Sequence, residues 1–586
     1  MRTAIFLPAG LILTILFVVY RFSEIIQLGP QDKIVQLVLL VSAAACFALY
    51  AARRTGRDLV QLILGKIMKL STVRFLGLLL VTLAVFSIWM AYVPFEGIPK
   101  GGDEAAYYFQ SKIYAAGQLA APAPSVDNPM AYFPFRHFIF RNNMWFIVYT
   151  PLHSLLMAPF TAAGAAPLLG PLEGLLSLIG IFLLIRFWTG EIMARISVIL
   201  LLLSPFFLFM TTTFMAHNTN LMLITWSLYM ISRRAKGASV ACGIAGGFLI
   251  GLAFVTKPYP VLVWLFFIPL AVILGCRDRW FRILAPAAAA AAIPFALFLL
   301  SNNYYTGNPL HAGYDLVRGG KLIGFGPDKA WFPEYGDYAH TPLRGIYNVV
   351  RQMGVGSTIL FGWPFLSLFP MLLAFRRARK DRRVLLLYLP LLLIMFLMFL
   401  HYCPAIDYGP RHYFTFLPVI LLLSVIGLRE AVSFARRRRG VEGSNTVTVF
   451  VLCLFLITLF VYMPEGIALR SGPWQTIDDQ PRITASEFVS TPSIVFMQAG
   501  EHGYPNISSG MIFNSPFLDN EIIYCAHQTP AEDILFMEAY PGRTSYLYWF
   551  DGTRFHIEPW TLDLSLAIKP TRDMEYYTYL HMPGPD

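Results

Sequence analysis

Apolar runs of membrane-spanning length recur along most of the chain, separated by shorter polar connections. A helix needs about 20 mostly apolar residues to cross the hydrocarbon core of a bilayer. The runs predict about thirteen spans, near 4–20, 34–52, 73–95, 168–187, 196–212, 214–231, 238–255, 259–275, 281–300, 356–375, 384–401, 411–428 and 446–463. Another apolar stretch, 148–163, contains two prolines and a histidine, and it predicts an interfacial or re-entrant segment. The pattern is that of a polytopic α-helical membrane protein.

The polar remainder of the chain divides it into three parts. Residues 1–72 are predicted to form two additional N-terminal transmembrane helices and a cytoplasmic loop. Residues 73–463 form the main transmembrane domain, with long outer loops at 96–167 and 302–355. Residues 464–586 change in character: short apolar runs predict strands at 493–498, 521–526 and 544–550, and "PAEDILFMEAY" (530–540) predicts a helix that begins at a proline. This tail is predicted to be a small α/β domain.

Charge gives the chain a predicted orientation. The sequence is 56% hydrophobic and 13% charged, with a formal net charge of +11. Its basic residues form short clusters between apolar runs, such as "RRARKDRR" (376–383) and "RRRR" (436–439), rather than one patch. That distribution argues against nucleic-acid binding and follows the positive-inside rule. With the N-terminus in the cytoplasm, every basic cluster falls on the inner side and the acidic tail falls outside.

The stretch "GGDEAAYYFQSKIYAAGQL" (101–119) places two carboxylates directly after a span. Its spacing predicts a helix over 103–118 that lies along the membrane interface. Asp103 and Glu104 then stand at the helix N-terminus. One interpretation is a helix cap, because Asp is favoured there and Glu complements the helix dipole. The other is a general base beside the bilayer, able to take a proton from a hydroxyl.

Four segments carry a resemblance to a known family. The "DE" pair and the tyrosine-containing helix after it are the first. The others are "FIVYTPLHSLLMAPF" (146–160), "DYGPRHYFTFLPVILLLS" (407–424) and "IIYCAHQTPAEDILFMEAYPGR" (522–543). Together they resemble membrane glycosyltransferases of the C fold (GT-C), such as protein O-mannosyltransferases and lipid A aminoarabinose transferases. Two departures are visible: Thr150-Pro151-Leu152-His153 replaces the usual Pro-Pro-Gly core, and His412 precedes the aromatic Tyr413.

The resemblance implies a reaction and a set of site residues. Family members move a sugar from a polyprenyl-phosphate donor to an acceptor hydroxyl outside the membrane, by direct displacement with inversion. It implies that residues 73–463 are the catalytic domain, that Asp103 is the base, and that Glu104 supports it or replaces it. Implied phosphate-binding residues are Arg411, Lys257, His412 and Tyr408, and implied substrate-lining residues are Tyr107, Tyr149 and His153. For Arg411 and Lys257, interfacial anchoring is the alternative.

Several points stay open at this level. The sugar is not legible from the sequence, and the acceptor could be a lipid, a glycan or a protein. No histidine spacing matches a metal motif, no cofactor is certain, and the family leaves room for a divalent cation. The implied location is a bacterial inner membrane, with the site and the tail in the periplasm. Two alternatives are a transporter or flippase of lipid-linked glycans and a non-catalytic scaffold. The spans are almost free of charge, and no internal repeat is visible, which argues against a transporter.

Overall fold

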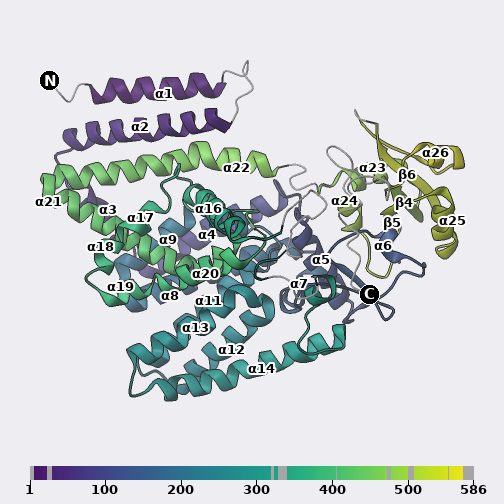
Figure 1. Ribbon diagram of the computed structural model, residues 1–586. Coiled ribbons are helices and arrows are strands. Elements are labelled where there is room, and N and C mark those ends of the chain that lie inside the picture. The colour runs from purple at the N-terminus through teal and green to yellow at the C-terminus, as the bar shows by residue number, and fades with distance from the viewer. Residues whose placement is uncertain are drawn as a thin grey trace.

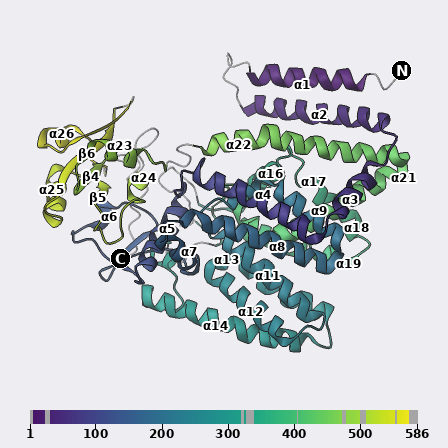
Figure 2. The ribbon, with the colours of Figure 1, turned by 180° about the vertical axis from the view of Figure 1, so that it is seen from behind.

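A computed structural model describes residues 5–22, 30–318, 323–326, 339–403, 405–471, 477–498, 507–551 and 554–571. The molecule has two parts, a large bundle of long helices and a small sheet-containing domain beyond one end of it (Figure 1). The opposite view shows the same arrangement, with the short segments α5, α6 and α7 between the two parts (Figure 2). Parts of the predicted outer loop 302–355, namely 319–322 and 327–338, lie outside the described residues.

The helices of the first half of the bundle follow the predicted spans closely, except for a helix at Leu59–Lys69 that falls in the predicted cytoplasmic loop. They are α1 (Phe6–Phe22), α2 (Pro30–Arg54), α3 (Leu59–Lys69), α4 (Thr72–Tyr92), α8 (Leu169–Thr189), α9 (Glu191–Leu202), α10 (Pro205–Met210), α11 (His217–Ala235), α12 (Val240–Thr256), α13 (Pro258–Gly275) and α14 (Trp280–Thr306), with the 3-10 helix η1 at Ala166–Leu168. The expected span 196–212 is split into α9 and α10. The split falls at Pro205, which has no backbone N–H to continue a helix, and Ser204 caps the new one.

The second half of the bundle departs further from prediction. Its helices are α15 (Gly313–Arg318), α16 (Pro342–Ile359), α17 (Phe369–Leu373), α18 (Phe375–Ala378), α19 (Arg382–Leu386), α20 (Leu389–Leu400), the 3-10 helix η3 (Arg411–Phe416), α21 (Leu417–Ile457), the π-helical turn η4 (Thr458–Tyr462) and α22 (Met463–Arg470). The expected span 356–375 is wrong as one continuous helix. The chain turns at Gly362, whose φ is +68°, and Pro364 follows before α17.

Seven segments of the described chain are long and apolar enough to cross a membrane. They are Ile34–Arg54, Thr72–Tyr92, Ala166–Thr189, Pro258–Gly275, Trp280–Thr306, Arg382–Leu400 and Arg411–Arg470. The last contains two of the predicted spans, because α21 is interrupted at Arg439 and Gly440, where the backbone is not helical. Shorter apolar helices lie at Phe6–Phe17, Leu152–Ala162 and Val240–Thr256. The protein is a multi-pass membrane protein.

Between α4 and α8 the chain builds a compact cap on the bundle. The predicted helix 103–118 forms as α5 (Gly102–Ala115). The predicted re-entrant stretch contains α7 (Leu152–Ala162), whose 11 residues span about 16 Å and cannot cross a bilayer. Between them lie α6 (Pro129–Tyr132) and an antiparallel sheet in the order β1-β3-β2, with β1 at Ala121–Pro122, β2 at Phe138–Arg141 and β3 at Met144–Ile147. The sequence did not predict this sheet.

The C-terminal domain is an α/β unit, and its three predicted strands are confirmed. Strands β4 (Ser493–Met497), β5 (Ile522–Ala526) and β6 (Thr544–Phe550) run parallel in a sheet of order β5-β4-β6-β7. The unpredicted β7 (Phe555–Pro559) pairs antiparallel with β6. Its helices are α23 (Gln480–Phe488), α24 (Ile507–Met511), α25 (Pro530–Ala539) and α26 (Leu562–Ala567). The predicted helix α25 begins with a capping box formed by Thr529 and Glu532.

The basic clusters and the small domain lie at opposite ends of the bundle. The clusters 376–383 and 436–439 belong to α18, α19 and α21, at the end far from β4–β7 (Figure 1). We therefore expect a membrane-impermeant maleimide to label Glu558→Cys in cells whose outer envelope is permeable and whose inner membrane is sealed. Glu558 is exposed on the small domain, which is expected to face outward. Lys380→Cys, exposed at the other end, should be labelled only after the membrane is permeabilised. Equal labelling of both sites in sealed cells would contradict the orientation.

Candidate active site

Asp103 lies in the first turn of α5 and faces side chains from three other segments. Gly101 is the N-cap residue of α5 and no side chain caps this helix, so the interpretation of Asp103 as a cap is wrong. Instead, its Oδ1 accepts a hydrogen bond of 2.6 Å from the Tyr149 hydroxyl and lies 3.5 Å from His137 Nε2. Its Oδ2 lies 3.3 Å from Arg411 Nη2. Asp103 is thus held by aromatic and cationic groups, not by its own helix.

Arg411 begins η3, at the point where the chain enters α21. Its guanidinium contacts Asp103 through Nη2 and Asp407 through Nη1, the latter at 3.0 Å. Both Arg411 and Asp103 are about one-tenth exposed at the side chain, whereas Asp407 is 40% exposed. Arg411 Nε is buried and has no hydrogen-bond partner among the described residues. The Arg411 guanidinium therefore has a buried N–H group that is still able to donate a hydrogen bond to a ligand.

The surroundings of Asp103 keep it ionised. Burial raises the pKa of this carboxyl, but the charge of Arg411 and, in smaller measure, His137, Lys257 and the Tyr149 hydroxyl lower it. The attractive contributions prevail, and the pKa of Asp103 lies well below its ordinary range. Asp103 is therefore a carboxylate at neutral pH, as a proton acceptor must be.

Glu104 has other partners than Asp103, and its pKa is shifted in the opposite direction. It is fully buried, Oε1 accepts a 2.7 Å hydrogen bond from the Tyr408 hydroxyl, and Oε2 accepts one of 3.0 Å from the backbone N–H of Phe214. Burial raises its pKa to about 7, against the lowering effect of these hydrogen bonds. Glu104 thus fastens α5 to the segments that lead into η3 and α11, while Asp103 faces the cations.

Basic side chains form a wall beside the Asp103–Arg411 pair. Lys257 lies between α12 and α13, and it interacts electrostatically with both Asp103 and Arg411. The imidazole rings of His217, His401 and His412 come from α11, the end of α20 and η3. The His412 ring centroid is 5.6 Å from that of His217 and 5.5 Å from that of His401. Both ring nitrogens of His217, and Nδ1 of His412, are buried and have no hydrogen-bond partner among the described residues.

The implied substrate-lining residues also gather here, but they are largely packed. Tyr107 is buried, its ring lies 4.6 Å from that of Tyr149, and its edge meets His153 at 4.9 Å. His153 Nδ1 lies 2.7 Å from Thr219 Oγ1, and this hydroxyl donates to the buried Glu173. Tyr149 alone reaches Asp103. Tyr107 and His153 therefore form the support behind the carboxylate.

Tyr149 also lines a pocket. It encloses about 270 Å³ of empty space, part of it open to solvent. Its wall consists of Phe146, Ile147, Tyr149, Thr150, Pro151, Ser301, Asn302, Tyr305, Ala312 and Gly313, from the β3–α7 connection and the ends of α14 and α15. One aromatic side chain thus borders both this mixed polar and aromatic pocket and the carboxylate.

The structure brings together most residues that the sequence analysis singled out. Asp103, Arg411 and Tyr149 are in direct contact, Lys257 and His412 lie beside them, and Tyr408 contacts Glu104 rather than Arg411. Further site residues that the motifs did not identify are His137, His217 and Asp407. Asp407 was detectable, since it stands one turn before Arg411 in the same segment. His137 and His217 follow no spacing rule, because only the fold brings them to the site.

Metal binding finds no support in side-chain geometry. Among the described residues, no group of three or more His, Cys, Asp or Glu side chains could hold a metal ion. The three imidazoles near Arg411 accordingly do not form such a group, although their rings are neighbours.

A known family model matches part of the chain. Residues 161–303, which run from the end of α7 to α14, match the family model described as dolichyl-phosphate-mannose-protein mannosyltransferase. This match leaves out both Asp103 and Arg411. No curated protein sequence matches the chain. The match agrees, for this part of the chain, with the resemblance to GT-C membrane glycosyltransferases that the motifs carry.

Comparison with solved structures finds matches that include three membrane glycosyltransferases. ArnT from Cupriavidus metallidurans bound to undecaprenyl phosphate is 14% identical, with a TM-score of 0.49, covering 82% of this chain and 94% of that one. The oligosaccharyltransferase AglB from Archaeoglobus fulgidus, in complex with an inhibitory peptide and a dolichol-phosphate, is 12% identical, with a TM-score of 0.41, covering 84% and 75%. The arabinosyltransferase EmbB from Mycobacterium smegmatis is 12% identical, with a TM-score of 0.39, covering 76% and 43%.

The raised pKa of Glu104 predicts a pH-dependent stability. The folded-state pKa of about 7 exceeds the ordinary value of 4.5, so the unfolded chain loses this proton first as pH rises. The corresponding stability is present at low pH and is lost through neutrality, with a total of about 3 kcal/mol at most. We expect the apparent Tm of the detergent-solubilised protein to fall as the pH rises from about 5 to about 8. Glu104→Gln should flatten that fall, and an unchanged slope in this variant would contradict the assignment.

Proposed function

We propose that the chain transfers a sugar from a polyprenyl-phosphate donor to an acceptor hydroxyl, with Asp103 as the general base. The observation that carries the proposal is the contact between Asp103 and Arg411, 3.3 Å apart at the end of an apolar helix bundle. A carboxylate and a guanidinium in that position can face the two ends of a displacement. The carboxylate meets the incoming hydroxyl, and the guanidinium meets the departing phosphate.

The chemistry is a single displacement at the anomeric carbon. The acceptor oxygen forms its bond to that carbon and passes its proton to Asp103. The bond between the carbon and the phosphate oxygen breaks, and the polyprenyl phosphate leaves with the electron pair. Attack opposite the leaving group inverts the configuration. Fixing both substrates at one place supplies several kcal/mol of the barrier, and base assistance contributes a further factor of about 100 or more.

The phosphate is proposed to bind against Arg411 and the neighbouring side chains of Lys257, His217 and His412. Arg411 Nε and the unpartnered ring nitrogens of His412 and His217 are buried polar atoms with capacity to contact an anion. Leaving such groups unpaired costs about 1–3 kcal/mol each, so an anionic ligand that contacts them binds favourably. Lys257 adds a further positive charge. Tyr408 acts indirectly, because its hydroxyl connects the segment before Arg411 to Glu104 on α5.

Donor binding also changes the base. Arg411 is the strongest of the groups that lower the pKa of Asp103. A phosphate that binds the same guanidinium competes for its charge, so the pKa of Asp103 rises toward its ordinary value. The carboxylate becomes a stronger base when the donor is in place. Premature proton uptake by the free enzyme is thereby avoided.

The layout fits a membrane-borne donor. In the solved ArnT and AglB structures named above, a lipid phosphate is bound, and the AglB structure also contains a peptide. For this chain we propose a polyprenyl-phosphate sugar that reaches the site from the bilayer and an acceptor that is a lipid, a glycan or a protein. The pocket beside Tyr149 is the proposed path of the acceptor, because it shares that side chain with Asp103. The proposed location is a bacterial inner membrane with the site facing the periplasm.

A flippase of lipid-linked glycans is the second candidate, and one observation favours it. Glu173 is buried inside the span Ala166–Thr189, where ionisable side chains often mark a transport path. Its link through Thr219 to His153, however, leads back to the support of Asp103. Transfer measured with purified protein in detergent separates the two functions, because a flippase has no measurable activity without a sealed membrane.

Asp103→Asn should abolish sugar transfer, with a loss of about 100-fold or more, because the amide cannot accept the proton. Transfer in detergent from a polyprenyl-phosphate sugar to membrane-extract acceptors is the measurement. Asp407→Asn is the matched control, since Asp407 contacts the same guanidinium but is 40% exposed. This control should lose less than about tenfold. Full activity of Asp103→Asn at normal abundance would remove the proposed base.

Arg411→Ala should chiefly weaken the use of the donor. Removing the guanidinium deletes charge-assisted hydrogen bonds to phosphate, and kcat/KM for the donor should fall about 100-fold. Arg411→Lys, which keeps the charge but not the fork of N–H groups, should lie between this variant and wild type. Lys380→Ala, at the opposite end of the bundle, serves as control. An unchanged donor KM in Arg411→Ala would contradict the phosphate site.

A further inference from the structure

The helix that carries Asp103 is also tied to the C-terminal domain. Lys112 lies near the C-terminal end of α5, and its Nζ donates to the backbone carbonyls of Ile512 and Asn514 at 2.6 and 2.9 Å. The same ammonium lies 4.6 Å from the centroid of the Tyr108 ring. Both carbonyls lie within three residues after the end of α24 (Ile507–Met511). One side chain thus joins α5 to a segment 400 residues later in the chain.

This contact is unlike an ordinary lysine at a surface. Among the described residues no carboxylate lies within ion-pair distance of Lys112, so its charge is directed to the two carbonyls and one ring. Burial lowers the pKa of Lys112 to about 7, because no anion offsets the loss of hydration. Burying the Lys112 ammonium lowers the stability of the fold unless its hydrogen bonds to the two carbonyls compensate for the lost hydration.

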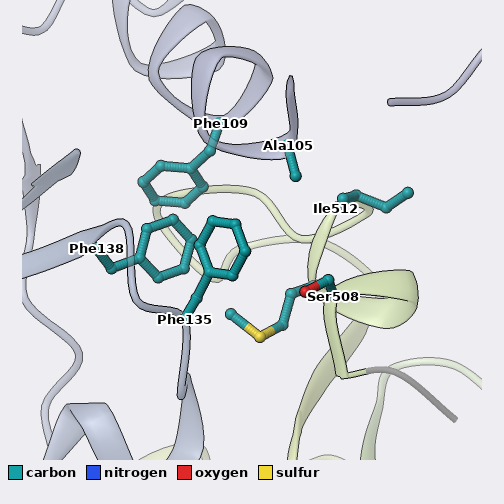
Figure 3. Close-up of a pocket in the computed structure, with 7 residues that line it drawn as sticks. Ala105, Phe109, Phe135, Phe138, Ser508 and Ile512 are labelled. Atoms are coloured by element: carbon teal, nitrogen blue, oxygen red, sulfur yellow. The ribbon is translucent and has the colours of Figure 1, made fainter. Parts of the chain in front are cut away.

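Apolar side chains also meet at this interface, where Phe109 of α5 and Met511 of the C-terminal domain belong to one buried cluster. A small pocket lined by both sides encloses about 280 Å³ of empty space, part of it open to solvent. Figure 3 shows Phe109, Phe135 and Phe138 on one side of it and Ser508 and Ile512 on the other. The Lys112 contact therefore lies beside an apolar contact between the same two parts of the chain.

The interface borders the proposed base. The Phe135 ring lies 5.0 Å from that of His137, and His137 Nε2 lies 3.5 Å from Asp103. Along α5, Lys112 follows Asp103 by nine residues, about 13.5 Å at the helical rise. A helix of this length moves as a rigid rod, so its placement at Lys112 determines the placement of Asp103.

We propose that the C-terminal domain positions the general base, and that Lys112 is the residue that connects the two. The inference rests on the proposed function, and Lys112 is a positioning residue that touches no substrate. Its contacts to Ile512 and Asn514 hold one end of α5, while Glu104 holds the other through Tyr408 and Phe214. With both ends fixed, Asp103 keeps its distance from Arg411.

Loss of the Lys112 contact should change the pKa of Asp103, which a general loss of stability would not do. The charged and titratable groups that interact with Asp103 are Arg411, His137, Lys257, His412, Tyr149, Glu104, Tyr107 and Tyr314. If α5 shifts, the attraction of Arg411, His137 and Lys257 weakens, and the pKa of Asp103 rises. Protonation then begins at higher pH, so the acidic limb of the pH–rate profile moves upward.

The test compares Lys112→Met with Lys112→Arg in the full-length protein in detergent. We expect Lys112→Met to lose at least about tenfold in kcat with an unchanged donor KM, and its acidic limb to move up by about one pH unit or more. Lys112→Arg retains donors and should restore most of the rate. Tyr132→Phe is the matched control, because the Tyr132 hydroxyl donates to the carbonyl of Glu532 in the same domain but lies outside α5. A Lys112→Met rate within twofold of wild type, or an equal loss in Tyr132→Phe, would overturn the inference.

Hydrogen exchange separates failure of this inference from failure of the proposed function. Amides of α5 should exchange about tenfold faster in Lys112→Met than in wild type, and Tyr132→Phe should leave them unchanged. This readout needs no substrate. If wild type shows no transfer yet α5 is loosened as expected, the proposed reaction is wrong and the link stands. If transfer depends on Asp103 but α5 exchanges equally in all variants, the link is wrong and the reaction stands.

Discussion

The ion pair between Asp103 and Arg411 is the contact on which the arrangement of the site depends. Removing two charges from water costs several kcal/mol, and their mutual attraction repays it only with good geometry and further hydrogen bonds. Here Tyr149 and His137 complete the surroundings of the carboxylate, and Asp407 those of the guanidinium. A buried ion pair of this kind is weak evidence that the pair stabilises the fold, so its presence calls for a functional explanation. The hydrogen bonds of Glu104 to Tyr408 and to the backbone of Phe214 hold α5 against the segment that leads to Arg411.

The sequence predicts the membrane part well because hydropathy reports a solvent preference that the bilayer enforces along each span. It fails where local backbone chemistry interrupts an apolar run. The expected helix 356–375 is broken at Gly362, and 196–212 is broken at Pro205. In the tail, β4, β5 and β6 were legible as continuous apolar runs. The edge strand β7 was not, since its half-exposed residues carry little hydrophobic signal.

The site was predictable only in part, and the reason is sequence separation. Asp103, Arg411 and Tyr149 stand in motifs with a recognisable order, so their roles could be proposed from the chain alone. Their contacts could not, because 103 and 411 meet only through the folding of the whole bundle. His217 and His401 carry no local signal at all. They become noticeable when α11 and α20 bring them beside His412, and when both ring nitrogens of His217 are found without a hydrogen-bond partner among the described residues.

The way the C-terminal domain is attached limits what can be exchanged between relatives of this protein. The domain follows α22 in the chain, and it also contacts the cap of the bundle through Lys112, Tyr132 and the Gln528 side chain, which donates to the Ala131 carbonyl. A chimera that receives only a foreign tail inherits the covalent connection without these partners. Swaps intended to alter selectivity therefore have to carry the segment 102–141 and the tail together, as one transplanted unit.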